Sequence, residues 1–285
     1  MAGQNPQFDG EIRSTDLTPA TMLGQGRTAE VYLYRERYVV KLFRPSFPKP
    51  AIENEYLVCQ AIGSLVDIPR AYNHLMIDGR DALVFDYIKG ESGFKYLFRN
   101  PWTVRKFAEQ FAVIHARIHS TSVPEEVPEL KTILIRNMNL DDLLPRASKE
   151  RVIEYLQRLP ARNTLCHGDY HPDNILLREG KPFVLDWMTA TRGHPLADVA
   201  RTSALLKWAQ PGPGIPAVFR VLLSTMRKRF YERYIAHYLK ITGVRIEEVE
   251  RWELPVLAAR LMEWIPKEEK DLLISIINEK LKRIP

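Results

Sequence analysis

Hydrophobic and polar positions alternate over short distances in the first third of the chain, which predicts a small antiparallel sheet. Between residues 20 and 88 the apolar runs are short, rich in Val, Tyr and Phe, and separated by charged turns, as is typical of strands. The runs are TMLG, AEVYLY, YVVKLF, NHLMI and ALVFDY. The stretch AIENEYLVCQAIG at 51–63 interrupts them and predicts one helix that stops at Gly63.

Beyond Gly90 the apolar spacing becomes helical. Phe107, Phe111, Ile114 and Ile118 recur at the spacing of one helix face. Further helices are predicted near 148–159 and from Pro195 onward, with breaks at PGPG (211–214) and Gly243, and NILLREGKPFVLD predicts two short strands. The pattern is α+β: a sheet region at 20–88, a mostly helical region at 89–285, and a flexible leader at 1–19.

Composition is that of a soluble globular protein, with 45% hydrophobic and 27% charged residues among 285. Two cysteines make no disulfide framework, and the polar first twenty residues lack the features of a secretory signal, so we expect a cytoplasmic location. The net charge of +6 lies after residue 200, where 16 Lys and Arg are interleaved with 10 Asp and Glu. This interleaving favours solvated helix faces over a nucleic-acid site.

The segment LGQGRTAEVY, from Leu23, places Gly24 and Gly26 between two predicted strands. A turn of small residues allows backbone N–H groups to approach phosphates closely, and the spacing is similar to that of the kinase loop G-x-G-x-x-G-x-V, with Ala29 in the third glycine position. A plain hairpin turn is the alternative interpretation.

Lys41 is isolated in the apolar run YVVKLF. It is either a lysine that protects a sheet edge or a lysine directed at the α- and β-phosphates of a nucleotide. The second role requires a carboxylate from the following helix, for which Glu55 is the candidate and Glu53 the substitute. The run VFDYIKG resembles a kinase hinge, where the Asp86 carbonyl and the Ile88 amide would contact adenine.

The segment HGDYHPDN at 167–174 permits two kinds of chemistry. As a metal site it would use His167, Asp169, His171 and Asp173, although Gly168 and Pro172 interrupt a strand. As a phosphoryl-transfer loop it assigns every residue a role: Asp169 accepts the hydroxyl proton, Asn174 and Asp186 offer oxygen ligands to Mg²⁺, and His167 orients the loop.

H-G-D-x-H-x-x-N followed by L-D-W resembles the signature of the aminoglycoside phosphotransferase and choline kinase-like family, distant relatives of protein kinases. The order of glycine loop, Lys41, Glu55, hinge, catalytic loop and the GHPLADVA segment is also similar over roughly residues 20–205. The resemblance implies a bilobal protein-kinase-like fold, ATP or GTP as donor, and Mg²⁺. It implies that Asp169 is the catalytic base, that Asn174 and Asp186 bind metal, and that Asp198 braces the catalytic loop.

The expected activity is therefore transfer of the γ-phosphoryl group to a hydroxyl of a small molecule. His171 stands where protein kinases place a lysine, and eleven residues between Asp186 and Asp198 leave no room for a peptide-binding segment. A protein Ser/Thr kinase, a metal-dependent hydrolase and an inactive nucleotide-binding module remain as alternatives. The basic C-terminal region weighs against a polycationic aminoglycoside as acceptor. We expect no nucleic-acid, membrane or obligate protein partner.

His115 and His119, four residues apart on one predicted helix, lack the glutamate of a zinc-protease motif. We expect them to pack near the catalytic loop.

Overall fold

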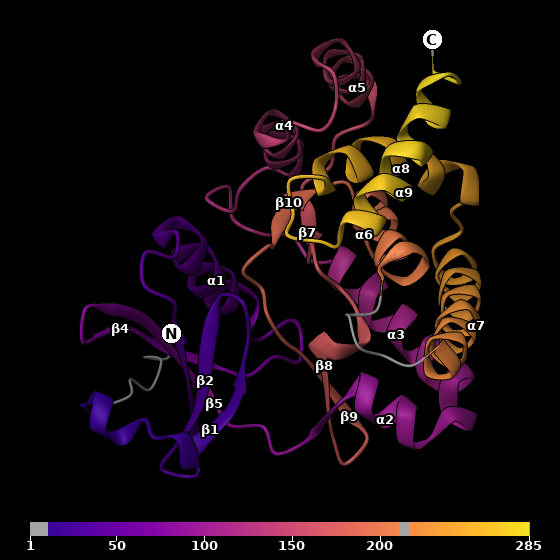
Figure 1. The fold of residues 1–285 in the computed structure, drawn as a ribbon. Helices are drawn as coiled ribbons and strands as arrows, with labels where there is room; N and C mark the ends of the chain where they lie inside the picture. The colour runs from indigo at the N-terminus through magenta and orange to yellow at the C-terminus, as the bar shows by residue number, and fades with distance from the viewer. Residues whose placement is uncertain (1–10, 211–216, 285) are drawn as a thin grey trace. The chain divides into compact units, whose positions relative to one another are not determined.

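The computed structural model describes residues 11–210 and 217–284, and the chain folds as two compact units. The first unit comprises residues 1–93 and 174–189, and the second comprises residues 94–173 and 190–285. Figure 1 traces the elements of both units by colour in chain order. The predicted break at 211–214 lies outside the described residues.

The first unit contains a five-stranded antiparallel sheet in the order β1-β2-β3-β5-β4. Its strands are β1 (Met22–Gln25), β2 (Ala29–Tyr34), β3 (Tyr38–Phe43), β4 (Ala71–Ile77) and β5 (Arg80–Asp86), and helix α1 (Lys49–Ile62) follows β3 in the chain. Every strand predicted from the apolar runs at 20–88 is present, as is the helix.

Side-chain alternation along β3 gives the sheet two different faces. Val40 and Leu42 pack on one side with Tyr32 and Val84, and Ile12 covers this cluster. Lys41 points the other way, toward α1, because successive side chains of a strand alternate between the faces. Within the segment predicted as a leader, Ile12 is buried against this cluster, and 3-10 turns with no buried residue follow at Ser14–Asp16 and Pro19–Thr21.

Residues 174–189 group with the sheet, although they lie about eighty residues further along the chain. The hairpin β8 (Ile175–Arg178) and β9 (Lys181–Val184) pairs through β8 with β6 (Glu91–Ser92). The Val184 amide donates to the Asp67 carbonyl at 2.9 Å, and Asn54 on α1 donates to the Met188 carbonyl at 3.2 Å. The sequence pattern suggested two contiguous regions that meet at residues 88 and 89. These long-range bonds are the reason that residues 174–189 group with the first region in the structure.

The second unit is mostly helical, as the periodicity after Gly90 predicts. Its helices are α2 (Gly93–Arg99), α3 (Val104–His119), α4 (Leu130–Leu140), α5 (Arg146–Arg158), α6 (Pro195–Trp208), α7 (Ala217–Thr242), α8 (Ile246–Arg260) and α9 (Lys267–Leu281). Two short strands, β7 (Thr164–Cys166) and β10 (Thr191–Gly193), pair with each other beside the helices. Helices α3 and α7 lie side by side, and their contact buries Phe107, Phe111 and Phe230.

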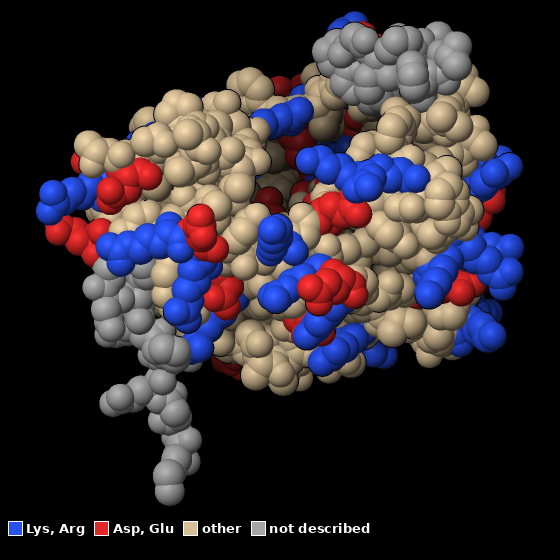
Figure 2. Space-filling model, turned by 90° about the horizontal axis from the view of Figure 1, so that it is seen from below, with Lys and Arg blue, Asp and Glu red and all other residues tan. Residues whose placement is uncertain are grey.

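The basic residues after position 200 are interleaved with acids in the structure as well. Lys207 and Lys280 both pair with Glu253, and Arg260 pairs with Glu269. On the face drawn in Figure 2, Lys and Arg side chains stand beside Asp and Glu side chains. Within the described residues, no helix combines the length and apolarity needed to span a bilayer.

Candidate active site

Lys41 is the centre of a buried ion-pair group in the first unit. Its Nζ lies 2.8 Å from both carboxylate oxygens of Glu55 on α1 and 3.0 Å from Oδ1 of Asp186. Strand β3 lies between β2 and β5, so Lys41 does not protect a sheet edge. Glu55, rather than the exposed Glu53, is the partner.

Electrostatics keep Lys41 charged. Burial acts to lower the pKa of Lys41, but the negative charges of Glu55 and Asp186 outweigh this effect and hold the pKa above its usual range. The Glu55 side chain is 2% exposed, so loss of the lysine would leave a buried carboxylate without its counter-charge. Burial also raises the pKa of Glu55, while the charge of Lys41 opposes that shift, so the lysine is the partner whose charged form is favoured.

Asn174 and Asp186 lie at the open end of the β8–β9 hairpin. Ile175 pairs with Val184, and the Leu185 amide donates to the Asn174 carbonyl at 2.8 Å, which brings the two candidate ligands beside each other in the same unit. Asp186 has a φ of +62°, a left-handed conformation that is uncommon for a non-glycine residue and is concentrated at functional sites. Its side chain is 39% exposed. Amide and carboxylate oxygens are the ligands that Mg²⁺ prefers, so this donor set fits a hard divalent cation.

The glycine segment forms a tight connection between β1 and β2. The Gly26 amide donates to the Ala29 carbonyl at 2.8 Å. A Cβ built at Gly24 would meet no atom within 4 Å, so the backbone is open on that side. At the far end of the sheet, Asp86 closes β5 and its carboxylate accepts a hydrogen bond from the Tyr72 hydroxyl at 2.8 Å, while Ile88 follows two residues later.

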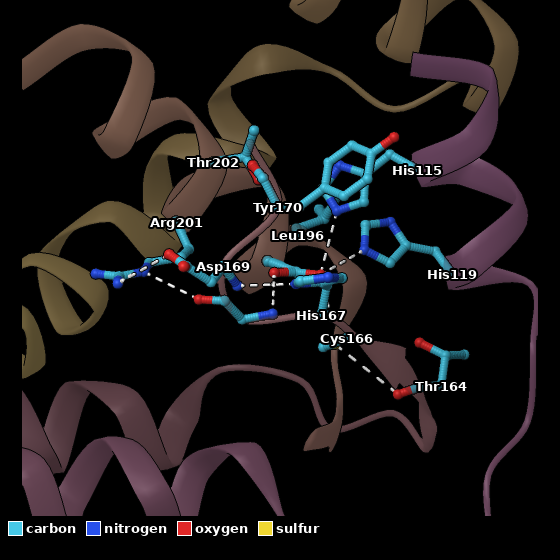
Figure 3. Close-up of polar contacts among 12 residues, drawn as sticks. His115, His119, Thr164, Cys166, His167, Asp169, Tyr170, Leu196, Arg201 and Thr202 are labelled. Carbon is cyan, nitrogen blue, oxygen red and sulfur yellow. Dashed lines mark hydrogen bonds and ion pairs between the residues drawn. The ribbon is translucent and has the colours of Figure 1, made fainter. Parts of the chain in front are cut away.

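Asp169 belongs to the second unit, and Figure 3 shows Arg201 beside it. His171 Nε2 is 3.4 Å from its Oδ2, and Arg201 Nη2 is 3.7 Å from its Oδ1. Arg201 also donates to the Gly168 carbonyl at 3.1 Å and lies 2.5 Å from Glu263. Burial acts to raise the pKa of Asp169, but the hydrogen bond from His171 and the positive charge of Arg201 hold it below its usual range. The carboxylate is ionised at neutral pH.

Asp198, near the start of α6, binds the backbone of residues 167–174, the predicted catalytic loop. Its two oxygens accept the backbone N–H groups of His167 at 2.6 Å and of Gly168 at 2.9 Å. They also lie 3.1 Å from Nε2 of His115 and 3.2 Å from Nε2 of His119 (Figure 3). The sequence-based expectation that these two histidines pack near the catalytic loop is confirmed.

Two tyrosines of α7 complete this group, and the sequence pattern did not single them out. The hydroxyls of Tyr234 and Tyr238 lie 2.7 Å from Nδ1 of His115 and His119 respectively. Because the carboxylate of Asp198 can only accept, both histidines donate their Nε2–H to it, and the neutral ring of His115 accepts from Tyr234 at Nδ1. Burial lowers the pKa of His115 to about 3, so its ring is neutral. Tyr234 and Tyr238 are four residues apart on α7, as His115 and His119 are on α3. This shared spacing is the one sign in the sequence that the two pairs could meet.

The alternative metal cluster is not assembled as expected. In the described part of the chain, the three residues whose ligand atoms converge within 4.8 Å are His115, His119 and Asp198, not those of the HGDYHPDN segment. The ring of His167 accepts from the Asp169 amide at 3.2 Å, and the ring of His171 accepts from the Asp173 amide at 3.3 Å. Both rings are therefore hydrogen-bonded to the backbone of their own segment.

The fold is that of kinases acting on small molecules. The chain is similar to the streptomycin–ATP ternary complex of APH(2")-IIa (TM-score 0.60, 16% identity, 90% of each chain covered). A thermostable mutant of APH(4)-Ia with AMP-PNP and hygromycin B gives 0.63 at 15% identity, covering 94% of this chain and 93% of that one. The amicoumacin kinase hAmiN with AMP-PNP, Ca²⁺ and Ami gives 0.62 at 12% identity, covering 95% and 92%.

Family membership follows from the sequence match. The model of the phosphotransferase enzyme family APH matches residues 20–249, and the chain belongs to this family. It is by class a phosphotransferase with a protein-kinase-like fold. A curated relative, acyl-CoA dehydrogenase family member 11 of Gallus gallus, is 32% identical over 87 residues. That segment covers 28% of this chain and about a ninth (11%) of the length of that relative.

Proposed function

We propose that the protein transfers the γ-phosphoryl group of ATP or GTP to a hydroxyl group of a small molecule. Lys41, held by Glu55, positions the α- and β-phosphates, and the loop of Gly24 and Gly26 covers them with backbone N–H groups. The backbone at Asp86 and Ile88 receives the base. The observation that carries the proposal is the Lys41–Glu55–Asp186 group, which fixes a charged lysine beside an oxygen ligand at a strained backbone position.

A divalent cation would be held by Asn174 and Asp186, which the backbone pairing places at the open end of the β8–β9 hairpin. When bound, such an ion neutralises charge on the transferring phosphoryl group. Calcium in the hAmiN complex and ATP or AMP-PNP in the other relatives support a nucleotide and a divalent ion. Streptomycin and hygromycin B in those relatives support a small-molecule acceptor here.

Asp169 acts on the acceptor hydroxyl. Its lowered pKa makes it a weak base in the ground state, so its main contribution is to accept the hydroxyl hydrogen bond and orient the oxygen for attack. Deprotonation follows as the new bond to phosphorus forms. Asp198 fixes the backbone N–H groups of His167 and Gly168, which directly precede Asp169. The Asp169 carboxylate is therefore already positioned when the reaction begins.

The test is calorimetric titration of Mg·ATP and Mg·GTP, followed by turnover with an acceptor panel, on wild type and three variants. Asp186→Ala should abolish Mg²⁺-dependent nucleotide binding, while Asp81→Asn, a carboxylate of the same unit paired with His74, should leave it unchanged. Asp169→Asn should keep nucleotide affinity and lose roughly 10²–10⁴-fold in turnover. Unchanged turnover in Asp169→Asn, or equal nucleotide affinity in Asp186→Ala and Asp81→Asn, would reject these roles.

A further inference from the structure

The second unit contains an apolar pocket of about 370 Å³ that the proposed chemistry leaves unexplained. It is lined by residues of α2, of the catalytic loop, of the end of α6 and of α7. Its apolar lining residues are Phe94, Leu97, Leu205, Leu206, Met226 and Phe230. The volume falls within the range of pockets that enclose small organic ligands.

The lining combines a buried floor with an exposed aromatic rim. Leu97 and Phe230 are each 2% exposed and form part of the core, whereas Phe94 is 38% exposed at the first turn of α2. An exposed ring beside a ready-made apolar cavity loses contact with water when a ligand enters, which is a favourable source of binding energy.

One side chain, that of His171, both lines the pocket and contacts the proposed base Asp169. His171, Pro172 and Asp173 of the catalytic loop form one wall. His171 Nε2 lies 3.4 Å from the Asp169 carboxylate. The imidazole ring of His171 therefore separates a molecule bound in the pocket from the carboxylate proposed to accept the hydroxyl proton. All of these residues belong to the same compact unit.

The charges at the wall do not suit a polycation. Among the described lining residues, Asp173 is the one carboxylate, and Arg227 is a cation. Arg227 directs its guanidinium to the Leu206 carbonyl at 3.1 Å and to the Ala209 carbonyl, and so caps the negative end of α6. Its donors are used by the fold, and the rest of the wall offers shape and apolar contact.

We propose that this pocket receives an apolar group of the acceptor, so that the substrate is an alcohol carrying an alkyl or aryl part. This inference rests on the proposed function. The hydroxyl oxygen forms a bond to the γ-phosphorus, and the bond from that phosphorus to the β,γ-bridging oxygen breaks. The hydroxyl proton passes to Asp169, and a phosphate monoester and the nucleoside diphosphate leave. The apolar group supplies affinity, and Asp169 supplies orientation.

Binding is tested first, independently of turnover. The full chain is labelled with ¹³C at the methionine methyl groups, the Met226 signal is assigned with Met226→Leu, and straight-chain alcohols from ethanol to octanol are titrated. The Met226 signal should shift and saturate, with affinity rising about fourfold per methylene (~0.8 kcal/mol) until the pocket is filled. Kanamycin should not shift it. An unmoved Met226 signal with octanol, or a flat chain-length series, overturns the inference.

A matched pair of variants locates the effect. Phe94→Ala removes the rim ring, and Phe98→Ala removes a ring of the same helix that is 52% exposed but does not line this pocket. Phe94→Ala should weaken octanol about tenfold and leave ethanol unchanged, whereas Phe98→Ala should behave as wild type. Equal effects of the two variants reject the pocket as the binding site.

Mg·ATP binding is measured on the same samples to separate this inference from the proposed function. Nucleotide binding together with phosphorylation of polycationic acceptors but not of alkyl alcohols refutes the apolar acceptor and retains the kinase. Absence of nucleotide binding to folded protein refutes the kinase itself.

Discussion

Replacing Asp198 with Asn should disturb the catalytic loop and leave nucleotide binding unchanged. Asp198 is 2% exposed, and its two oxygens receive four donors, from the His167 and Gly168 amides and from two imidazoles. An asparagine side chain keeps one accepting oxygen and turns an N–H group toward a donor. At least one charge-assisted bond is lost, and at least one buried donor is left unpaired.

The cost can be worked from these contacts. A hydrogen bond to a charged group contributes about 1.5–3 kcal/mol, and a buried donor without a partner costs about 1–3 kcal/mol. We therefore expect Asp198→Asn to lower the free energy of unfolding by roughly 2.5–6 kcal/mol, a range that contains the cost of about 3–5 kcal/mol for breaking a buried charge pair. A domain of ordinary stability, about 5–15 kcal/mol, would remain folded at 25 °C in most of that range.

The assay pairs urea unfolding with steady-state kinetics. Mg·ATP affinity should stay within about twofold of wild type, because the proposed nucleotide residues belong to the other unit, while turnover should fall by about 10²-fold through a misplaced Asp169. The control is Asp141→Asn. Asp141 is also buried and also accepts two backbone amides, those of Leu143 and Leu144, but it lies in the turn before α5.

Asn caps backbone amides nearly as well as Asp, so Asp141→Asn should cost less than about 1 kcal/mol and leave turnover intact. If Asp198→Asn loses no more stability than Asp141→Asn, or keeps full turnover, then Asp198 does not hold the loop in the way its hydrogen bonds indicate.

Three further outcomes follow from single contacts. Glu55→Gln removes the buried counter-charge of Lys41 and should weaken nucleotide binding at least tenfold by calorimetry, whereas Glu53→Gln at an exposed position of the same helix should not. Gly24→Ala meets no atom within 4 Å, so the thermal midpoint should stay within about 2 °C while Mg·ATP affinity falls if this backbone covers the phosphates; unchanged affinity would remove the loop from the nucleotide site. For His115, whose folded-state pKa of about 3 lies below the unfolded value of 6.5, the unfolded state binds more protons between these pH values. Stability should therefore be fully present above pH 6.5 and fall by up to ~1.4 kcal/mol per pH unit as the pH drops toward 3, which urea midpoints measured across that range would show; a flat profile contradicts a neutral buried ring.

The fold could be predicted from the sequence where local pattern decides the structure. The apolar runs defined β2, β3 and β5, and the helical period defined α3, because one buried face imposes its spacing on the chain. Helix α4 and the strand pair β7–β10 were missed. Each is stabilised by a distant partner, as in the pairing of Thr191 with Cys166, and pairing across that separation leaves no local period in the sequence.

The residues of the candidate site also differ in how far local sequence could identify them. Glu55 could be paired with Lys41 because the requirement for a carboxylate on the next helix limits the choice to two residues, and the structure shows which one is buried. Tyr234 and Tyr238 could not be assigned, since a tyrosine on an amphipathic helix is ordinarily part of the core. Only the fold brings α7 against the histidines of α3. The roles of the catalytic and metal-binding residues remain predictions.

The position of residues 174–189 has a consequence for how the protein is made. The sheet unit is assembled from two pieces of chain, and its second piece supplies Asp186 and the strand that bonds to Asp67. A ribosome that has released only the first 93 residues has therefore produced all five strands of the sheet but not the complete unit, which also needs the hairpin. A fragment ending at Gly93 should be unstable when expressed alone, and one supplied with the hairpin as a separate peptide should gain protection from proteolysis.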